Sequence, residues 1–179
     1  MNSAEADLLF SPDELKQKAR ELAKKISRDF AGEQLLVVGI LKGAFIFMAD
    51  LVREIDLDVQ IDFMDVSSYG MSTLSSGEVR INKDLDFPLK DKNVLIVEDI
   101  IDSGLTLNYI VEILKKREPK KISICCLLDK PSRRKSSIRP DYVGYTINDD
   151  FVVGYGLDYA ERYRSCPGIY ILKRSVYEK

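Results

Sequence analysis

Hydrophobic residues recur at two different spacings along this chain of 179 residues. Helical spacing comes first, at Leu15, Ala19, Leu22, Ala23, Ile26 and Phe30. Ser11 can cap this helix, Pro12 suits its first position, and Glu14 completes a capping box. The pattern predicts a helix that begins at Pro12 and ends at Ala31-Gly32.

Continuous apolar runs at residues 35–41, 94–97 and 122–128 predict strands buried on both faces. Helices are predicted at 44–55 and 105–117, after the first two of these strands. Residues 59–66 alternate between apolar and polar side chains, which predicts a strand with one solvated face. The alternation of strand and helix indicates an α/β fold with a mostly parallel central sheet flanked by helices.

Residues 67–77 are rich in Ser, Gly and Thr and have no hydrophobic period. Because long loops in compact domains are usually functional or disordered, a mobile loop is expected here. Shorter strands are predicted at 142–146, 151–154 and 169–172. The length favours a single domain over residues 1–179, with the core sheet in about 35–128.

Composition removes several classes of chemistry, because the chain contains no histidine. Acid–base steps must use Asp, Glu, Lys, Tyr or Cys, and a metal must be held by oxygen ligands or by Cys. Lys and Arg number 27 and Asp and Glu number 29, so the net charge is −2. This balance argues against a dedicated nucleic-acid binder.

Cysteine usage bears on the cellular compartment. Cys125 and Cys126 lie inside an apolar run, and Cys166 stands alone. An odd number without C-x-x-C spacing, together with an acidic and polar N-terminus, is typical of the reducing cytoplasm. No apolar run approaches the ~20 residues that cross a membrane. We therefore expect a cytoplasmic protein without a membrane partner.

The clearest motif is VLIVEDIIDSGLT at residues 94–106, in which a strand meets the start of a helix. A glycine-containing turn before a helix directs several backbone N–H groups at one spot, and the helix dipole adds partial positive charge. Ser103 and Thr106 add hydroxyl groups, so the turn suits a phosphate monoester. Neither the P-loop pattern nor the G-x-G-x-x-G pattern is present.

Two carboxylates, Glu98 and Asp99, come just before this turn. They do not help to bind a phosphate, but they suit a ligand that also carries hydroxyl groups and Mg²⁺, such as a ribose phosphate. A capped helix with solvated acids explains each residue singly, but it does not explain the complete run.

Residues 98–106 resemble the phosphoribosyl-pyrophosphate signature of the purine phosphoribosyltransferases, closest to the 6-oxopurine subgroup of hypoxanthine phosphoribosyltransferases. Further resemblances cover most of residues 35–172 in the family's order. Residues 41–43 are similar to its pyrophosphate loop, 67–77 to its flexible lid, and 128–130 with 151–158 to its purine-binding segments. The resemblance implies a type I phosphoribosyltransferase-like fold, with a hood formed by the N-terminal segment and about 140–179.

The resemblance also implies a reaction. The 5-phosphoribosyl group would pass from phosphoribosyl pyrophosphate to N9 of hypoxanthine or guanine, giving IMP or GMP and pyrophosphate in purine salvage. The enzyme would be a pentosyltransferase that depends on Mg²⁺ and forms a homodimer or homotetramer. Two alternatives stay open, a preference for xanthine and an RNA-binding regulator of the same fold. The second would use a local basic patch of Arg133, Arg134, Lys135 and Arg139, for which a solvated turn or a subunit contact is the preferred reading.

The resemblance assigns roles residue by residue. Ribose and its phosphate would be bound by Glu98, Asp99, Asp102, Ser103, Gly104, Leu105 and Thr106. Pyrophosphate would be bound by Lys42, Gly43, Ser68, Tyr69 and Arg164. The purine would be bound by Lys130, Phe151, Val152 and Asp158, and Mg²⁺ by Glu98, Asp99 and Asp158.

Three of these roles carry a stated chemistry. Asp102 would act as the general base at purine N7, or would only orient the purine. The ammonium of Lys130 can only donate, so it would favour a 6-oxopurine over adenine. Phe151 would stack on the base or would pack in the core. In this family the peptide bond before Lys42 can be cis.

Overall fold

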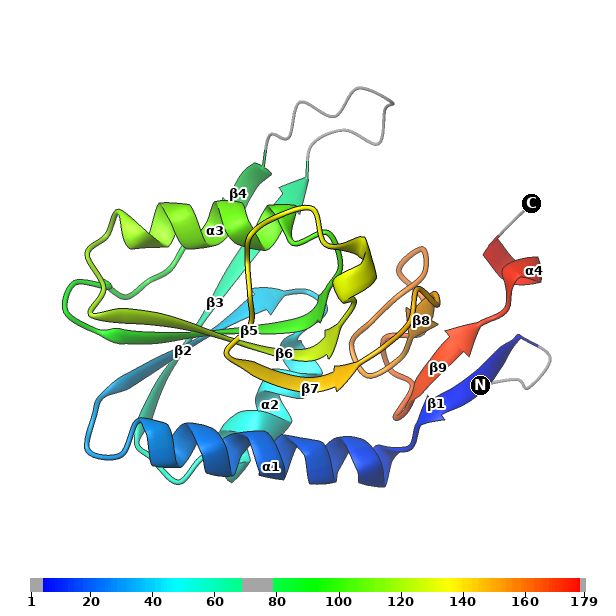
Figure 1. The fold of residues 1–179 in the computed structure, drawn as a ribbon, viewed down its shortest axis with the longest axis horizontal. Helices are drawn as coiled ribbons and strands as arrows, with labels where there is room; N and C mark the ends of the chain where they lie inside the picture. Colours follow the sequence, from blue (N-terminus) through cyan, green and yellow to red (C-terminus); the bar gives the residue numbers. More distant parts are fainter. Residues whose placement is uncertain (1–4, 69–78, 178–179) are drawn as a thin grey trace.

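A six-stranded sheet in the order β4-β3-β2-β5-β6-β7 forms the centre of the molecule (Figure 1). Its strands are β2 (Leu35–Leu41), β3 (Val59–Ser68), β4 (Val79–Lys83), β5 (Asn93–Ile101), β6 (Lys121–Asp129) and β7 (Tyr142–Thr146). All neighbouring pairs are parallel except β3 and β4. The predicted fold class is therefore confirmed. This computed structural model describes residues 5–68 and 79–177.

Helices cover both faces of this sheet, with α1 (Pro12–Asp29) and α2 (Phe45–Glu54) on one face and α3 (Leu105–Lys115) on the other (Figure 1). Along β2, Leu35 and Val37 belong to the core beneath α1 and α2. The alternate residues Leu36 and Val38 belong to the core beneath α3. Burial on both faces is the physical reason for the continuous apolar runs.

The first helix has the predicted start. The Glu14 backbone N–H donates to Ser11 Oγ at 3.3 Å, and the Ser11 N–H donates to the Glu14 carboxylate at 2.8 Å. This reciprocal capping box satisfies backbone donors that the first turn leaves unpaired. Pro12 occupies the first helical position, as predicted.

A second, three-stranded sheet lies beside the first, in the order β1-β9-β8. It joins β1 (Ala6–Phe10) near one end of the chain to β8 (Val152–Val153) and β9 (Ile169–Leu172) near the other (Figure 1). The short helix α4 (Arg174–Tyr177) follows β9. Sequence analysis predicted neither β1 nor β4. In addition, β7 pairs with β6, so residues 142–146 extend the core sheet beyond the predicted range of 35–128.

Two boundaries near the central motif also differ from the prediction. Strand β5 continues to Ile101, so Glu98 and Asp99 lie within the strand and not after it. Helix α3 ends at Lys115, two residues before the predicted end. Within the described ranges, no helix is long and apolar enough to cross a membrane.

Candidate active site

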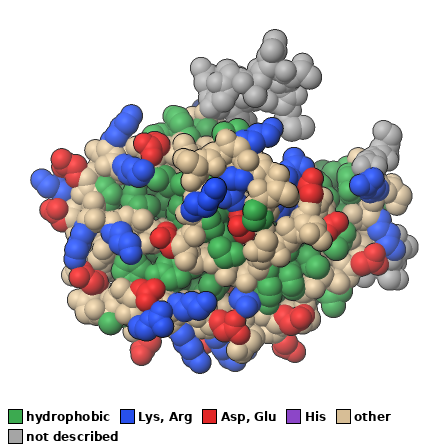
Figure 2. Space-filling view, in the orientation of Figure 1, with side chains coloured by type: hydrophobic (Ala, Val, Ile, Leu, Met, Phe, Trp, Pro, Cys, Tyr) green, Lys and Arg blue, Asp and Glu red, His purple; other side chains and the backbone are tan. Residues whose placement is uncertain are grey.

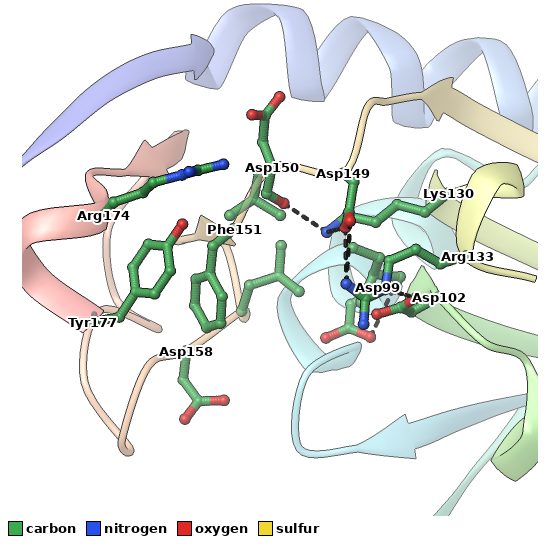
Figure 3. A pocket seen from close by; sticks show the side chains of 13 residues that line it. Asp99, Asp102, Lys130, Arg133, Asp149, Asp150, Phe151, Asp158, Arg174 and Tyr177 are labelled. Atoms are coloured by element: carbon green, nitrogen blue, oxygen red, sulfur yellow. Dashed lines mark hydrogen bonds and ion pairs between the residues drawn. The ribbon is translucent and has the colours of Figure 1, made fainter. Parts of the chain in front are cut away.

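A cavity of about 530 Å³ lies between the ends of β5 and β6 and the second sheet (Figure 3). Side chains of both sheets and of their connections line it, among them Asp99, Ile100, Asp102, Lys130, Phe151, Val152, Leu157 and Asp158. Ligands of parallel sheets bind at the carboxyl ends of the strands, and this cavity occupies that position. Six of the predicted site residues therefore meet in one place.

Lys130 follows β6 and is buried, with its side chain 8% exposed. Its Nζ donates to the backbone carbonyl of Asp150 at 2.6 Å and lies 4.0 Å from Asp149 Oδ1. Burial lowers the pKa of Lys130, while the nearby acids Asp102 and Asp149 oppose the shift. The structure thus fixes a single ammonium group on the wall of the cavity.

Phe151 lies in this cavity with 38% of its surface exposed. The ring of Tyr177 stacks on it, with ring centres 5.0 Å apart and planes 28° apart (Figure 3). Tyr159 meets the same ring edge-on at 5.7 Å. Phe151 is therefore not an ordinary core residue, and its aromatic neighbours hold the ring at the cavity wall.

Asp102 lies after β5 and faces two cations of the cavity wall. Arg133 Nε is 2.7 Å from Asp102 Oδ1, and Arg133 Nη1 donates to both oxygens of Asp149 at 3.0 and 3.2 Å. Lys130 is close enough for Asp102 to act on its pKa. The expected proton acceptor is thus part of a charged cluster that lines the cavity.

A smaller concavity of about 150 Å³ is formed by the turn that precedes α3. Glu98, Asp102, Ser103, Gly104 and Thr106 line it. Gly104 caps α3 with φ +73°, a conformation that favours glycine, and a Cβ there would lie 2.5 Å from Ser136 Oγ. Leu105 begins the helix, and its N–H lies 3.4 Å from Ser103 Oγ. The geometry is that of a backbone cradle for an anion.

Asp99 and Gly43 are in close contact across the ends of β5 and β2. A Cβ on Gly43 would overlap the Asp99 carboxylate, so any larger residue here would push that side chain away. Burial raises the pKa of Asp99 to about 6, and burial with the neighbouring Asp99 charge raises the pKa of Glu98 well above its usual range. Two carboxyl groups held this closely favour a proton or a cation.

Lys42 and Arg164 lie at the other end of the site, and the Leu41–Lys42 peptide bond is cis. Lys42 Nζ is 3.0 Å from Glu161 Oε2, and an Arg164 Nη atom is 3.3 Å from Glu161 Oε1. The same guanidinium contacts Asp158 Oδ1 at 2.9 Å and donates to the Gly156 carbonyl at 2.8 Å. One glutamate therefore contacts both cations that sequence analysis assigned to pyrophosphate.

Two further predicted residues belong to the lid. Ser68 ends β3. Tyr69 lies outside the described residues, as does most of the predicted lid at 67–77.

Comparison with known proteins decides the family. The model of the phosphoribosyl transferase domain matches residues 9–160. Hypoxanthine-guanine phosphoribosyltransferase of Bacillus subtilis is 54% identical over 171 residues, which cover 96% of this chain and 95% of that protein. The chain belongs to the purine phosphoribosyltransferase family.

Solved structures agree with this membership. A hypoxanthine phosphoribosyltransferase from Staphylococcus aureus matches with a TM-score of 0.95 and 47% identity over 100% of both chains. The Trypanosoma cruzi hypoxanthine phosphoribosyl transferase is 37% identical and matches with a TM-score of 0.93 over 99% of this chain and 96% of that chain. The protein is therefore an enzyme of the pentosyltransferase class.

Several residues of this phosphoribosyltransferase site were missed by sequence analysis. Arg133 was read as part of a solvated basic turn, but it pairs with two acids inside the cavity. Glu161 and Tyr177 carried no motif signal, because their contacts come from turns and a terminal helix. Ile100 lies in the central motif, and its place between two acidic positions was the only available signal.

Proposed function

We propose that this enzyme transfers the 5-phosphoribosyl group from phosphoribosyl pyrophosphate to N9 of hypoxanthine and guanine, giving IMP or GMP and pyrophosphate in purine salvage. The observation that carries the proposal is the buried ammonium of Lys130 on the cavity wall. The names of the relatives from B. subtilis and S. aureus support the same substrates.

Lys130 supplies the discrimination between bases. Its Nζ already donates to the Asp150 carbonyl and keeps N–H groups for the cavity, where a 6-oxo group can accept. The 6-amino group of adenine is a hydrogen-bond donor, and so is the Lys130 ammonium, so the two cannot form a hydrogen bond. Because the site is buried, the mismatch leaves polar groups unpaired and costs affinity.

Asp102 handles the proton. As purine N9 forms its bond to ribose C1, the bond from C1 to pyrophosphate breaks through an oxocarbenium-like centre. The positive charge that develops on the purine is relieved when the N7 proton passes to the Asp102 carboxylate. With no histidine in the chain, a carboxylate within the cavity is the acceptor that the site offers.

Lys42 and Arg164 receive the pyrophosphate. Both contact the exposed carboxylate of Glu161, so the phosphate oxygens of the substrate must replace that carboxylate. Exposed ion pairs contribute little free energy, which makes the replacement easy. Gly43 lies in the same loop as Lys42, residues 41–43, and brings the backbone of that loop next to Asp99.

Mg²⁺ fits the residues that are present. Glu98 and Asp99 are oxygen ligands with raised pKa values, so a cation near them offsets their repulsion. Among the described residues no group of three or more acidic or sulfur ligands forms a cage. Mg²⁺ commonly uses one or two carboxylates plus substrate phosphates, which suits this arrangement. Asp158 would serve through water, and the bound ion would neutralise the leaving pyrophosphate.

The proposal is tested by mixing the enzyme with phosphoribosyl pyrophosphate, Mg²⁺ and one base at a time. We expect IMP from hypoxanthine and GMP from guanine, each matched by one pyrophosphate. Turnover of xanthine alone would favour the xanthine-preferring alternative. If no 6-oxopurine is consumed under these conditions, the proposed function is wrong.

The contacts of two residues from the basic patch disfavour the RNA-binding alternative. Arg134, from the patch that would serve it, is buried and donates to the Ile138 carbonyl at 2.9 Å. Arg133 is engaged by Asp102 and Asp149. On the face drawn in Figure 2, Lys and Arg side chains are interspersed with Asp and Glu and do not form one basic field.

We also propose a homodimer or homotetramer in the cytoplasm. Phe45 and Ile61, at 43% and 44% exposure, are large apolar side chains that a second copy could cover. The three cysteines are unpaired, as a reducing compartment requires. Light scattering of the purified protein measures the number of subunits.

A further inference from the structure

We propose that Arg133 is a positioning residue that orients the Asp102 carboxylate. Through Asp149 and Asp150, it also links this carboxylate to Lys130. The inference rests on the proposed function, since it concerns the proton acceptor of that reaction. Arg133 ends a short 3₁₀ turn, Pro131–Arg133, that directly follows Lys130. Its guanidinium reaches both Asp102 and Asp149 (Figure 3).

The two oxygens of Asp102 are in different environments. Oδ1 is inaccessible to solvent and makes no aligned hydrogen bond, although Arg133 Nε lies only 2.7 Å away. The Asp102 side chain as a whole is nevertheless 43% exposed. The accessible oxygen is therefore Oδ2. The guanidinium covers one oxygen by charge and leaves the other open to accept a proton.

Arg133 also pairs with a second acid, Asp149, which keeps its charge balanced when Asp102 takes up a proton. Its Nη1 donates aligned hydrogen bonds to both oxygens of Asp149. When the N7 proton moves to Asp102 Oδ2, that carboxylate becomes neutral, and Arg133 keeps Asp149 as its counter-ion. A guanidinium paired with Asp102 alone would lose its only partner at that moment.

Asp149 also links the proton acceptor to the base-recognition group. The next residue, Asp150, provides the carbonyl that holds Lys130 Nζ at 2.6 Å. The contacts run from Asp102 through Arg133 to Asp149, and from Asp150 to Lys130. The oxygen that accepts the N7 proton and the ammonium that meets O6 are thus held by one connected set of residues.

The neighbouring Arg134 has a different task, which makes Arg133 testable. Arg134 Nε donates to the Asp102 carbonyl at 3.1 Å, and its other nitrogens contact the Ile138 carbonyl and the Asp129 carboxylate. The backbone of the turn at Asp102 is therefore held without Arg133. Removal of Arg133 frees the carboxylate while leaving the turn in place.

The test compares kcat and KM for Arg133→Met, Arg133→Lys and the control Lys135→Met, which changes an exposed cation two residues away. We expect Arg133→Met to lower kcat about 10- to 100-fold, because small misplacements of a reacting group have effects of this size. KM for phosphoribosyl pyrophosphate should stay within about threefold, and the control should match the unmodified enzyme. The kcat of Arg133→Lys should lie between those of Arg133→Met and the unmodified enzyme, because one ammonium group cannot pair with Asp102 and Asp149 as well as a guanidinium does.

A double-variant cycle separates positioning from general damage. In the Asp102→Asn background, Arg133→Met should change kcat less than about threefold, because its target is already lost. If the fold-losses of kcat in Asp102→Asn and Arg133→Met multiply in the double variant, the inference is wrong. It is also wrong if Arg133→Met alone leaves kcat unchanged. Thermal unfolding of each variant checks that the fold is kept. An unmodified enzyme that consumes no 6-oxopurine would instead overturn the proposed function.

Discussion

The two ends of the site, which we assign to the purine base and to pyrophosphate and call the base end and the pyrophosphate end, both combine cations with carboxylates but hold them differently. At the base end, Lys130 is 8% exposed and bound to a backbone carbonyl, and Arg133 is shared by two acids. At the pyrophosphate end, Lys42 and Glu161 are 63% and 65% exposed and contact each other. Lys130 is fixed by burial, and Arg133, which is 51% exposed, is held by two acids, whereas Lys42 is held by one surface ion pair that another anion can replace.

This difference matches what each end would recognise under the proposed function. A purine edge offers single hydrogen-bonding groups, so its partner must be held in one orientation before the base arrives. Pyrophosphate would bring several charges together with the proposed Mg²⁺, and these would outcompete one carboxylate for exposed cations. Since exposed pairs contribute about 0–1 kcal/mol and buried unpaired groups cost more, substitution of the buried Lys130 should have a larger effect than substitution of the exposed Glu161.

The largest effect is expected at Asp102. Asp102→Asn keeps the shape of the side chain and removes the proton acceptor, so kcat should fall by about 10²- to 10⁴-fold. Binding of phosphoribosyl pyrophosphate, measured by calorimetry, should change less than about threefold. Equal losses in turnover and in donor binding would contradict a role as general base.

Removal of the proposed Mg²⁺ should act on the opposite end. With EDTA in excess, turnover should fall at least about 100-fold, because the charge of the leaving pyrophosphate is no longer neutralised. Binding of the free base or of IMP should be less affected, and added Mg²⁺ should restore the rate. Full activity in EDTA would remove the metal from the proposal.

Lys130→Met should lower kcat/KM for hypoxanthine about 10- to 100-fold, the size expected for a hydrogen bond from a charged group. KM for phosphoribosyl pyrophosphate should hardly change, because Lys130 lies at the base end. The control Lys135→Met changes an exposed lysine of the next turn. If KM for phosphoribosyl pyrophosphate rises by as large a factor as kcat/KM for hypoxanthine falls, the two ends do not act separately.

The smallest effect is expected at Glu161. Glu161→Gln frees Lys42 and removes one of the two acids that contact Arg164. KM for phosphoribosyl pyrophosphate should therefore fall about two- to fivefold at low salt, and the difference should shrink at high salt. The matched control is Glu112→Gln, which breaks another exposed pair, with Lys115, on α3. A higher donor KM in Glu161→Gln would show that this carboxylate helps the substrate instead of competing with it.

The central sheet could be predicted from the sequence because both faces are buried. Continuous apolar runs identify β2, β5 and β6, and the capping box of Ser11 and Glu14 gives the start of α1. The second sheet was harder. Strand β1 pairs with β9, which lies more than 150 residues away along the chain, and its Leu8 is exposed, so no local period identifies it.

The same contrast applies to the site. Residues 98–106 could be placed because strand, turn and helix are contiguous in the sequence. Arg133 and Glu161 could not, because their partners are Asp102 and Lys42, which are distant along the chain. A run of arginines looks the same in sequence whether it is solvated or, as for Arg134, buried beneath a turn.

Recognition of the base by Lys130 is tested most directly by one ratio, kcat/KM for hypoxanthine against kcat/KM for adenine in the unmodified enzyme with phosphoribosyl pyrophosphate and Mg²⁺. The buried ammonium of Lys130 predicts conversion of hypoxanthine to IMP and at least about 100-fold less conversion of adenine. If the enzyme converts adenine as efficiently as hypoxanthine, Lys130 does not select for a 6-oxopurine.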